Sequence, residues 1–287
     1  MSISMPGPRC EKIPRVPRAL ASAAVLAGGE GRRLGVSKVL LSVDGRSLLL
    51  GLLDKLGAVF QEVLLVTKDE PNPAEGEVFR EAENMGGVRV VRDVYPNKGP
   101  LGGIHASLYH ASSPLVFVTA CDMPFPSLPL ALALLVKARG REAAVPRVGG
   151  YLEPLFAVYA AKAASKAREF LDKGVLQVSR FIESLDAYYM EEDEVTRYDP
   201  QRISFRNINS WEDLESLRRI WDLEAPKDLP TIACFPETTS YGASDIPGLL
   251  RIDEPHWSAG GGEEAASELH QQEEQAERHE EHPGRHL

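Results

Sequence analysis

The stretch SAAVLAGGEGRRLG, residues 22–35, joins a short apolar run to a glycine-rich loop. The run predicts a buried strand over residues 23–26 that ends where the glycines begin. Glycines in such a loop let the backbone approach a phosphate chain and turn N–H groups toward it, while Arg33 and Lys38 can neutralise its charge. The spacing is neither that of a P-loop nor that of a dinucleotide-binding fingerprint. The loop therefore predicts a triphosphate site of another kind, with a glycine-rich turn that binds no ligand as the alternative.

From residue 22 onward, short apolar runs rich in β-branched residues alternate with longer amphipathic segments. This alternation is typical of βαβ units, so the sequence predicts an α/β fold with a mostly parallel sheet and helices on both faces. The expected strands cover residues 23–26, 63–66, 88–91, 115–119, 143–145 and 155–159. The expected helices cover residues 47–56, 75–84, 102–110, 127–138, 162–173 and 178–185. A turn-rich segment and a final helix follow, with Ser210 as N-cap and Asp213 at the third helical position.

The two ends of the chain differ in composition from the middle. Residues 1–20 are basic and interrupted by prolines, which predicts a flexible leader before a globular domain over residues 21–224. Residues 225–287 carry 4 basic and 13 acidic side chains, so most of the net charge of −10 belongs to them. Their prolines, glycines and histidines predict a disordered acidic tail, with a histidine metal site as the minor alternative.

Composition also excludes several classes of protein. The body is nearly neutral and has no basic stripe, so a nucleic-acid partner is not expected. No apolar run reaches the roughly 20 residues needed to cross a bilayer, so no membrane association is expected. Cys10, Cys121 and Cys234 lie far apart, which argues against a disulfide framework and a thiolate zinc site. A reducing cytoplasm is the expected location.

Two carboxylates follow predicted strands. Asp93 comes just after the third strand and precedes the run Gly-Pro-Leu-Gly-Gly at residues 99–103, which would allow backbone to pack closely against a base or ribose. Asp93 fits a turn equally well. Asp122 ends a fully apolar strand that Pro124 stops, and one such carboxylate can hold Mg²⁺ while substrate phosphates and water complete its coordination. Because ligands bind beyond the carboxyl ends of parallel strands, both carboxylates are expected at the same edge as the glycine loop.

Taken in order, these motifs resemble those of the molybdenum cofactor guanylyltransferases, over roughly residues 22–220. The similarity rests on Leu26 to Gly29, Arg33 to Gly35, Lys38, Asp93, Gly99 to Gly103, Cys121 to Pro124, Glu153 to Ala157 and Phe205 to Ser210. The resemblance implies a Rossmann-like nucleotidyltransferase fold that binds GTP and Mg²⁺. It implies transfer of GMP to the terminal phosphate of molybdopterin carrying molybdenum or tungsten, and molybdoenzymes or cofactor-insertion proteins as partners.

The resemblance also assigns roles to single residues. It implies that nucleotide is bound by the loop and by the two carboxylates, and that the later asparagines line the acceptor side. The residues are Leu26, Ala27 and Gly28 for the nucleotide, Lys38 for its phosphates, Asp93 for the guanosine, Asp122 for Mg²⁺, and Asn207 and Asn209 for the acceptor.

Some positions depart from the family pattern. Ser37 stands where the family has an aspartate, Leu34 replaces a methionine, and Thr67-Lys68-Asp69 occupies the place of an asparagine after the second strand. A cytidylyltransferase of the same superfamily is the nearest alternative, although the glycine pairs at residues 28–29 and 102–103 favour guanine. Sugar-phosphate nucleotidyltransferases and a non-catalytic nucleotide-binding regulator are further alternatives, and the presence of Lys38 and Asp122 argues against the regulator.

Overall fold

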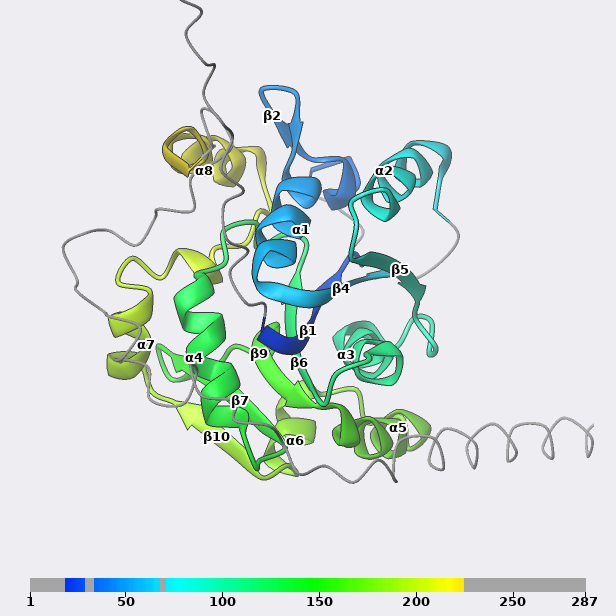
Figure 1. Cartoon of the computed structure of the whole chain (residues 1–287), viewed down its shortest axis with the longest axis vertical. Helices are drawn as coiled ribbons and strands as arrows, with labels where there is room; N and C mark the ends of the chain where they lie inside the picture. Colours follow the sequence, from blue (N-terminus) through cyan, green and yellow to red (C-terminus); the bar gives the residue numbers. More distant parts are fainter. Residues whose placement is uncertain (1–18, 29–33, 68–70, 225–287) are drawn as a thin grey trace, which may run out of the picture. The chain divides into compact units, whose positions relative to one another are not determined.

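The computed structural model describes residues 19–28, 34–67 and 71–224 (Figure 1). Within these residues an eight-stranded sheet has the order β10-β7-β9-β6-β1-β4-β5, with β8 paired to β7, and β2 and β3 form a separate hairpin. The strands are β1 (Ala19–Leu26), β2 (Ser42–Val43), β3 (Arg46–Ser47), β4 (Phe60–Thr67), β5 (Val88–Arg92), β6 (Leu115–Ala120), β7 (Ala143–Val148), β8 (Tyr151–Leu152), β9 (Phe156–Ala160) and β10 (Ala187–Met190). The expected acidic tail and residues 1–18 of the expected leader lie outside the described residues.

Strand β1 lies at the centre of the sheet, between β4 and β6. It runs parallel to both, and Val25 is paired with Leu65 on one side and Thr119 on the other. The chain extends the sheet from β1 through β4 to β5 and then returns to the other side of β1 with β6. Such a reversal leaves a crevice beyond the carboxyl ends of the strands, where ligands bind in α/β proteins. The mostly parallel sheet is confirmed, and β9 is antiparallel to both β6 and β7.

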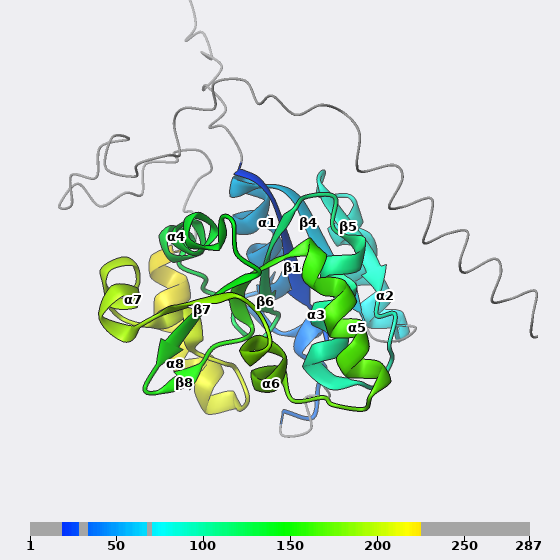
Figure 2. The same cartoon turned by 90° about the horizontal axis from the view of Figure 1, so that it is seen from below.

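Helices cover both faces of the sheet, as predicted (Figures 1 and 2). Successive side chains of a strand point to opposite faces, so β1 contributes Ala23 and Val25 to one hydrophobic cluster and Ala24 and Leu26 to another. The first cluster contains residues of α1 (Leu48–Val59), α2 (Pro73–Glu83), α4 (Leu128–Ala138) and α7 (Glu192–Tyr198). The second contains residues of α3 (Gly99–His110), α5 (Ala164–Asp172) and α6 (Val178–Glu183).

A third, smaller cluster joins three distant parts of the chain. Leu34 and Leu41, which flank the 3₁₀ turn η1 (Lys38–Leu40), pack with Phe125 and with Leu217 of α8 (Trp211–Glu224). The start of α8 is capped as predicted, because the Ser210 hydroxyl accepts from the backbone N–H three residues later, at 3.2 Å. The segment that carries the predicted lysine is therefore held against the last described helix.

The largest difference from the sequence prediction lies between residues 186 and 205. This stretch, expected to consist of turns, contains β10, which pairs in parallel with β7, and α7. Both elements are too short for their periodicity to stand out from a turn. Residues 19 and 20, which were expected in the leader, belong to β1, where Ala19 pairs with Phe60. Two smaller shifts bear on the site: α3 begins at Gly99, and β9 begins at Phe156, one residue late.

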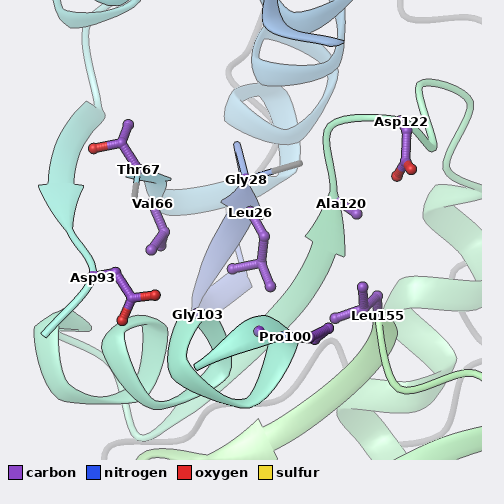
Figure 3. Close-up of a pocket in the computed structure, with 11 residues that line it drawn as sticks. Leu26, Gly28, Val66, Thr67, Asp93, Pro100, Gly103, Ala120, Asp122 and Leu155 are labelled. Carbon is purple, nitrogen blue, oxygen red and sulfur yellow. The ribbon is translucent and has the colours of Figure 1, made fainter. Parts of the chain in front are cut away.

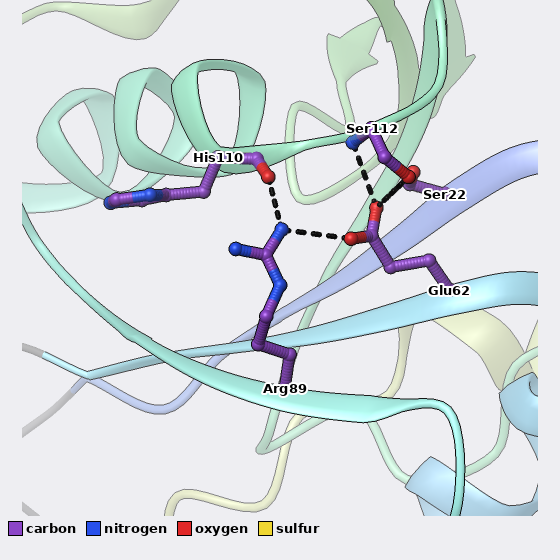
Figure 4. Close-up of polar contacts among 5 residues, drawn as sticks. All are labelled: Ser22, Glu62, Arg89, His110 and Ser112. Atoms are coloured by element: carbon purple, nitrogen blue, oxygen red, sulfur yellow. Dashed lines mark hydrogen bonds and ion pairs between the residues drawn. The ribbon is translucent and has the colours of Figure 1, made fainter.

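The carboxylate of Glu62 binds several strands together near their amino ends (Figure 4). Glu62 of β4 accepts hydrogen bonds from the Ser22 hydroxyl at 2.5 Å and from the backbone N–H and hydroxyl of Ser112, both at 2.9 Å. Arg89 of β5 contacts the other Glu62 oxygen at 2.8 Å and also donates to the carbonyl oxygen of His110. One side chain therefore links β1, β4, β5 and the segment that follows α3.

We expect Glu62→Gln to lower the free energy of unfolding by about 2 kcal/mol, because an amide cannot accept all of these hydrogen bonds. Burial raises the pKa of Glu62, but the hydrogen bonds from Ser112, Ser22 and Arg89 outweigh it, so the pKa lies below its ordinary value of 4.5. The native state then binds fewer protons than the unfolded one, and this stabilisation is lost as the pH falls below that value. Urea unfolding at pH 7 and pH 4 measures both effects.

Glu169→Gln is the matched control. Glu169 pairs with Lys173 at 3.7 Å, and both side chains are about two-thirds exposed (65% and 70%). Such a pair contributes at most about 0.5 kcal/mol. Equal losses for the two variants would contradict the role given to Glu62.

No helix in the described part of the chain has both the length and the hydrophobicity that a bilayer-spanning segment requires.

Candidate active site

A cleft opens at the carboxyl edge of the sheet, where β1, β4, β5 and β6 end. Asp93 and Asp122 stand at opposite ends of it, with Leu26 between them (Figure 3). This is the crevice created by the reversal of strand order beside β1. The residues that line it are Leu26, Gly28, Val66, Thr67, Asp93, Gly99, Pro100, Gly103, Ala120, Asp122 and Leu155.

The end of β1 is held by both of its neighbours. The Ala27 N–H donates to the Val66 carbonyl oxygen at 2.8 Å, and the Cys121 N–H donates to the Leu26 carbonyl oxygen at 3.1 Å. Leu26 and Gly28 line the cleft, whereas Ala27 packs against the first hydrophobic cluster. Residues 29–33, and with them Arg33, lie outside the described residues.

Lys38 and Asp122 form an ion pair at one end of the cleft. The Lys38 Nζ lies 2.6 Å from Asp122 Oδ2, and the two side chains are only 13% and 19% exposed. The same ammonium donates to Asn209 Oδ1 at 2.7 Å. The backbone N–H of Ile208 donates to the carbonyl oxygen of Asp122 at 2.9 Å, so the two chain segments lie against each other. Three predicted site residues from distant parts of the sequence therefore meet here, while Asn207 is exposed on the same segment.

Asp93 is held at the other end of the cleft by its own backbone and by the turn that follows. Its N–H donates to the Thr67 carbonyl oxygen at 2.7 Å, and its Oδ1 accepts the Tyr95 N–H at 3.0 Å. A Cβ on Gly102 would lie 2.9 Å from the Tyr95 carbonyl oxygen and 3.0 Å from Asp93 Oδ2. A Cβ on Gly103 would lie 3.0 Å from Leu26 Cδ1. The glycine pair thus lets α3 pack closely against Asp93 and Leu26. Gly99 and Gly103 also line the cleft, and the contact of this run with a base or ribose stays a prediction.

Residues 23–188 match the MobA-like NTP transferase domain family. A molybdenum cofactor guanylyltransferase from Syntrophotalea carbinolica is 33% identical over 200 residues, which cover 69% of this chain and 90% of that protein. The chain belongs to the MobA-like NTP transferase family. A probable molybdenum cofactor guanylyltransferase from Methanosarcina mazei is 36% identical over 205 residues, covering 70% of this chain and 91% of that protein. The crystal structure of molybdopterin-guanine dinucleotide biosynthesis protein A from Archaeoglobus fulgidus is 29% identical, with a TM-score of 0.60, and covers 70% of this chain and 99% of that one.

Membership of the MobA-like family confirms the resemblance drawn from the motifs and the Rossmann-like nucleotidyltransferase fold. The chain is therefore an enzyme of the nucleotidyltransferase class. Nucleotidyltransferases of this kind generally use a divalent metal. The described residues contain no group of three or more His, Cys, Asp or Glu side chains that could hold a metal alone. The cleft instead offers Asp122, and one carboxylate suits a cation that takes its other ligands from substrate phosphates and water.

The sequence prediction missed several cleft residues of this MobA-like enzyme. Val66, Thr67 and Leu155 line the cleft but carry no charge that would single them out. The available signal was their position, since Val66 and Thr67 end the strand next to β1. Thr67 lies within the segment that replaces the family asparagine, and its hydroxyl is directed at the Val91 carbonyl oxygen at 3.4 Å.

His105 of α3 lies behind the turn that holds Asp93. Its ring meets Tyr95 edge-on at 5.0 Å and stacks on Tyr109 at 6.0 Å between centroids. The residue is 4% exposed, and within the described residues its Nδ1 has no hydrogen-bond partner. Burial, with the Arg168 charge adding to it, lowers the pKa of His105 to about 4.

We therefore expect acid to destabilise the protein through His105. Between its native pKa of about 4 and its ordinary value of 6.5, the unfolded state binds a proton that the native state does not. Stability falls as the pH falls through this range, by roughly 2 kcal/mol between pH 7 and pH 5 from this residue. Urea unfolding at both pH values should show a smaller loss for His105→Gln than for the wild-type protein. The same loss in both proteins would contradict this prediction.

Proposed function

We propose that this protein transfers the GMP moiety of GTP to the terminal phosphate of molybdopterin that carries molybdenum or tungsten. An oxygen of the acceptor phosphate forms a bond to the α-phosphorus, the bond between that phosphorus and the bridging α,β-oxygen breaks, and pyrophosphate leaves. The guanine dinucleotide form of the cofactor is the product. The observation that carries the proposal is that Asp93 and Asp122 share a cleft at the carboxyl edge of the sheet, with Lys38 paired to Asp122.

Each predicted nucleotide-binding residue has a role in this reaction. Leu26, Ala27 and Gly28 bind the nucleotide as the chain leaves β1, and Asp93 binds its guanosine part at the far end. A carboxylate can accept two N–H donors from guanine or the ribose hydroxyls. The nucleotide would then lie along the cleft, with its nucleoside at Asp93 and its phosphates at Asp122.

Lys38 and Asp122 act at the phosphate end. The Lys38 ammonium neutralises phosphate charge, and it has three donors, of which Asp122 and Asn209 use two. Asp122 would hold Mg²⁺, which when bound polarises the α-phosphoryl group and balances the charge that develops on it. In such a transfer the protein mainly positions two anions for in-line attack and neutralises their charge.

The acceptor would approach from the side on which Leu155 and Pro100 lie (Figure 3), and the exposed Asn207 is its further proposed contact. The terminal phosphate of the acceptor must reach the α-phosphorus beside Asp122. A nucleotide bound between Asp93 and Asp122 would leave this side of the cleft open to the acceptor. GTP and molybdopterin are thus the proposed substrates, and molybdoenzymes or insertion proteins that receive the product are the proposed partners. The cysteine content keeps the cytoplasm as the proposed location.

Nucleotide selectivity tests the proposal most directly. With Mg²⁺ present, GTP at about 100 times its dissociation constant should stabilise the protein by about 2.7 kcal/mol, which for a body of this size raises Tm by roughly 5–10 °C. CTP and ATP should produce much smaller shifts. Equal shifts with the three nucleotides, or none, would contradict guanylyl transfer. Product analysis after incubation with GTP, Mg²⁺ and metal-loaded molybdopterin then identifies the acceptor.

A further inference from the structure

Asn209 is an exposed residue that contacts Lys38 and is not among the residues that line the cleft. Its Oδ1 accepts from Lys38 Nζ at 2.7 Å, almost the same distance as the 2.6 Å from that nitrogen to Asp122 Oδ2. The ammonium is thus shared between a charged and a neutral acceptor. Because an ammonium carries only donors, the amide oxygen is the atom of Asn209 that can face it.

The two acceptors of Lys38 differ in what else they can bind. In the proposed function Asp122 also holds the cation that accompanies the nucleotide, and a divalent cation and an ammonium on one carboxylate repel each other. The neutral amide of Asn209 has no such second role. When the nucleotide is bound, Lys38 therefore loses much of its attraction to Asp122 and keeps its hydrogen bond to Asn209.

The position of Asn209 is itself determined by its neighbours. Its backbone N–H donates to Asp213 Oδ2 at 2.9 Å, and the N–H of Ser210 donates to the same oxygen at 2.9 Å. The pKa of Asp213 is lowered chiefly by the hydrogen bond from the Asn209 backbone, with a further contribution from the Lys38 charge. On the other side, Ile208 is buried in the third hydrophobic cluster and donates to the Asp122 backbone. Asn209 is therefore held between the start of α8 and the end of β6.

We propose that Asn209 is a positioning residue, which keeps the Lys38 ammonium directed into the cleft when Asp122 engages the cation of the bound nucleotide. The start of α8 thereby contributes to nucleotide binding, 171 residues along the chain from the lysine. This role rests on the proposed function, and it differs from the contact with the acceptor that the family resemblance implies for Asn209.

A double-mutant cycle on nucleotide affinity tests the role. In the full-length protein, Asn209→Ala should weaken binding of GTP in the presence of Mg²⁺ about tenfold, as measured by titration calorimetry. Asn209→Leu, which keeps the branched shape of the side chain but removes the acceptor oxygen, should weaken it equally. Lys38→Met should weaken binding more. Adding either Asn209 substitution to Lys38→Met should change the affinity less than threefold, because residues that act as a unit are not additive.

Glu212→Ala is the matched control, since Glu212 is an exposed residue in the first turn of α8. The affinity of this variant for GTP in the presence of Mg²⁺ should stay within twofold of wild type. Thermal unfolding without ligand verifies that each variant is folded. A full tenfold loss in the Lys38→Met background, or wild-type affinity for Asn209→Leu, would overturn the role of Asn209.

The outcome also separates this inference from the proposed function. If the wild-type protein prefers CTP or ATP to GTP, guanylyl transfer fails, and the same cycle with the preferred nucleotide still decides the role of Asn209. If none of the three nucleotides binds, both proposals are wrong.

Discussion

Asp122→Asn keeps the fold but slows pyrophosphate release at least about 1,000-fold, which is the largest effect that we expect from a single substitution. The amide retains the shape of the side chain and an acceptor oxygen for Lys38, which lies 2.6 Å from Asp122 Oδ2 in the wild-type protein. It loses the negative charge that a divalent cation needs. Release of pyrophosphate from GTP in the presence of Mg²⁺ and molybdopterin measures the effect, and circular dichroism verifies the fold.

Asp186→Asn makes the same chemical change away from the cleft. Asp186 is 62% exposed and pairs with Arg141 at 3.1 Å, so its substitution should leave turnover within about twofold of wild type. Near-normal pyrophosphate release by Asp122→Asn would remove Asp122 from the reaction. An equal loss in both variants would mean that the effect is not specific to the cleft.

Gly102→Ala should reduce the affinity for GTP about 30-fold, which corresponds to roughly 2 kcal/mol, and lower the free energy of unfolding by about 1–2 kcal/mol. The new Cβ would lie 2.9 Å from the Tyr95 carbonyl oxygen and 3.0 Å from Asp93 Oδ2. A backbone atom cannot rotate away as a side chain can, so either α3 or the turn that holds Asp93 must move. Titration calorimetry with GTP and urea unfolding measure the two effects.

Gly57→Ala provides a matched control, because Gly57 also lies within a helix, α1, and no heavy atom lies within 4 Å of the position of a new Cβ. Alanine favours helix over glycine by about 0.5–1 kcal/mol, so this variant should be slightly more stable than wild type and bind GTP normally. If Gly102→Ala behaves like Gly57→Ala, then Gly102 does not position Asp93.

The sequence predicts the parts of the fold that depend on local patterns. The central strands and the longer helices have apolar periods that extend over many residues, and all of them are present with shifts of a few residues at their ends. The segment between residues 186 and 205 is harder to predict, because β10 and α7 are short and gain stability from packing against β7 and α4. Their residues Tyr188 and Val195 reach the first hydrophobic cluster only in the folded chain.

By itself, the sequence determined that Asp93 and Asp122 reach one edge of a sheet, because each follows an apolar run and parallel strands end on the same side. The tertiary structure alone decided which groups meet there. Lys38 contacts both Asp122 and Asn209, at separations of 84 and 171 residues, because α8 packs over the lysine segment through the third hydrophobic cluster. Likewise, Gly102 is needed for the approach of α3 to Asp93. Contacts of this kind depend on distances between elements, and no local pattern of residue types encodes them.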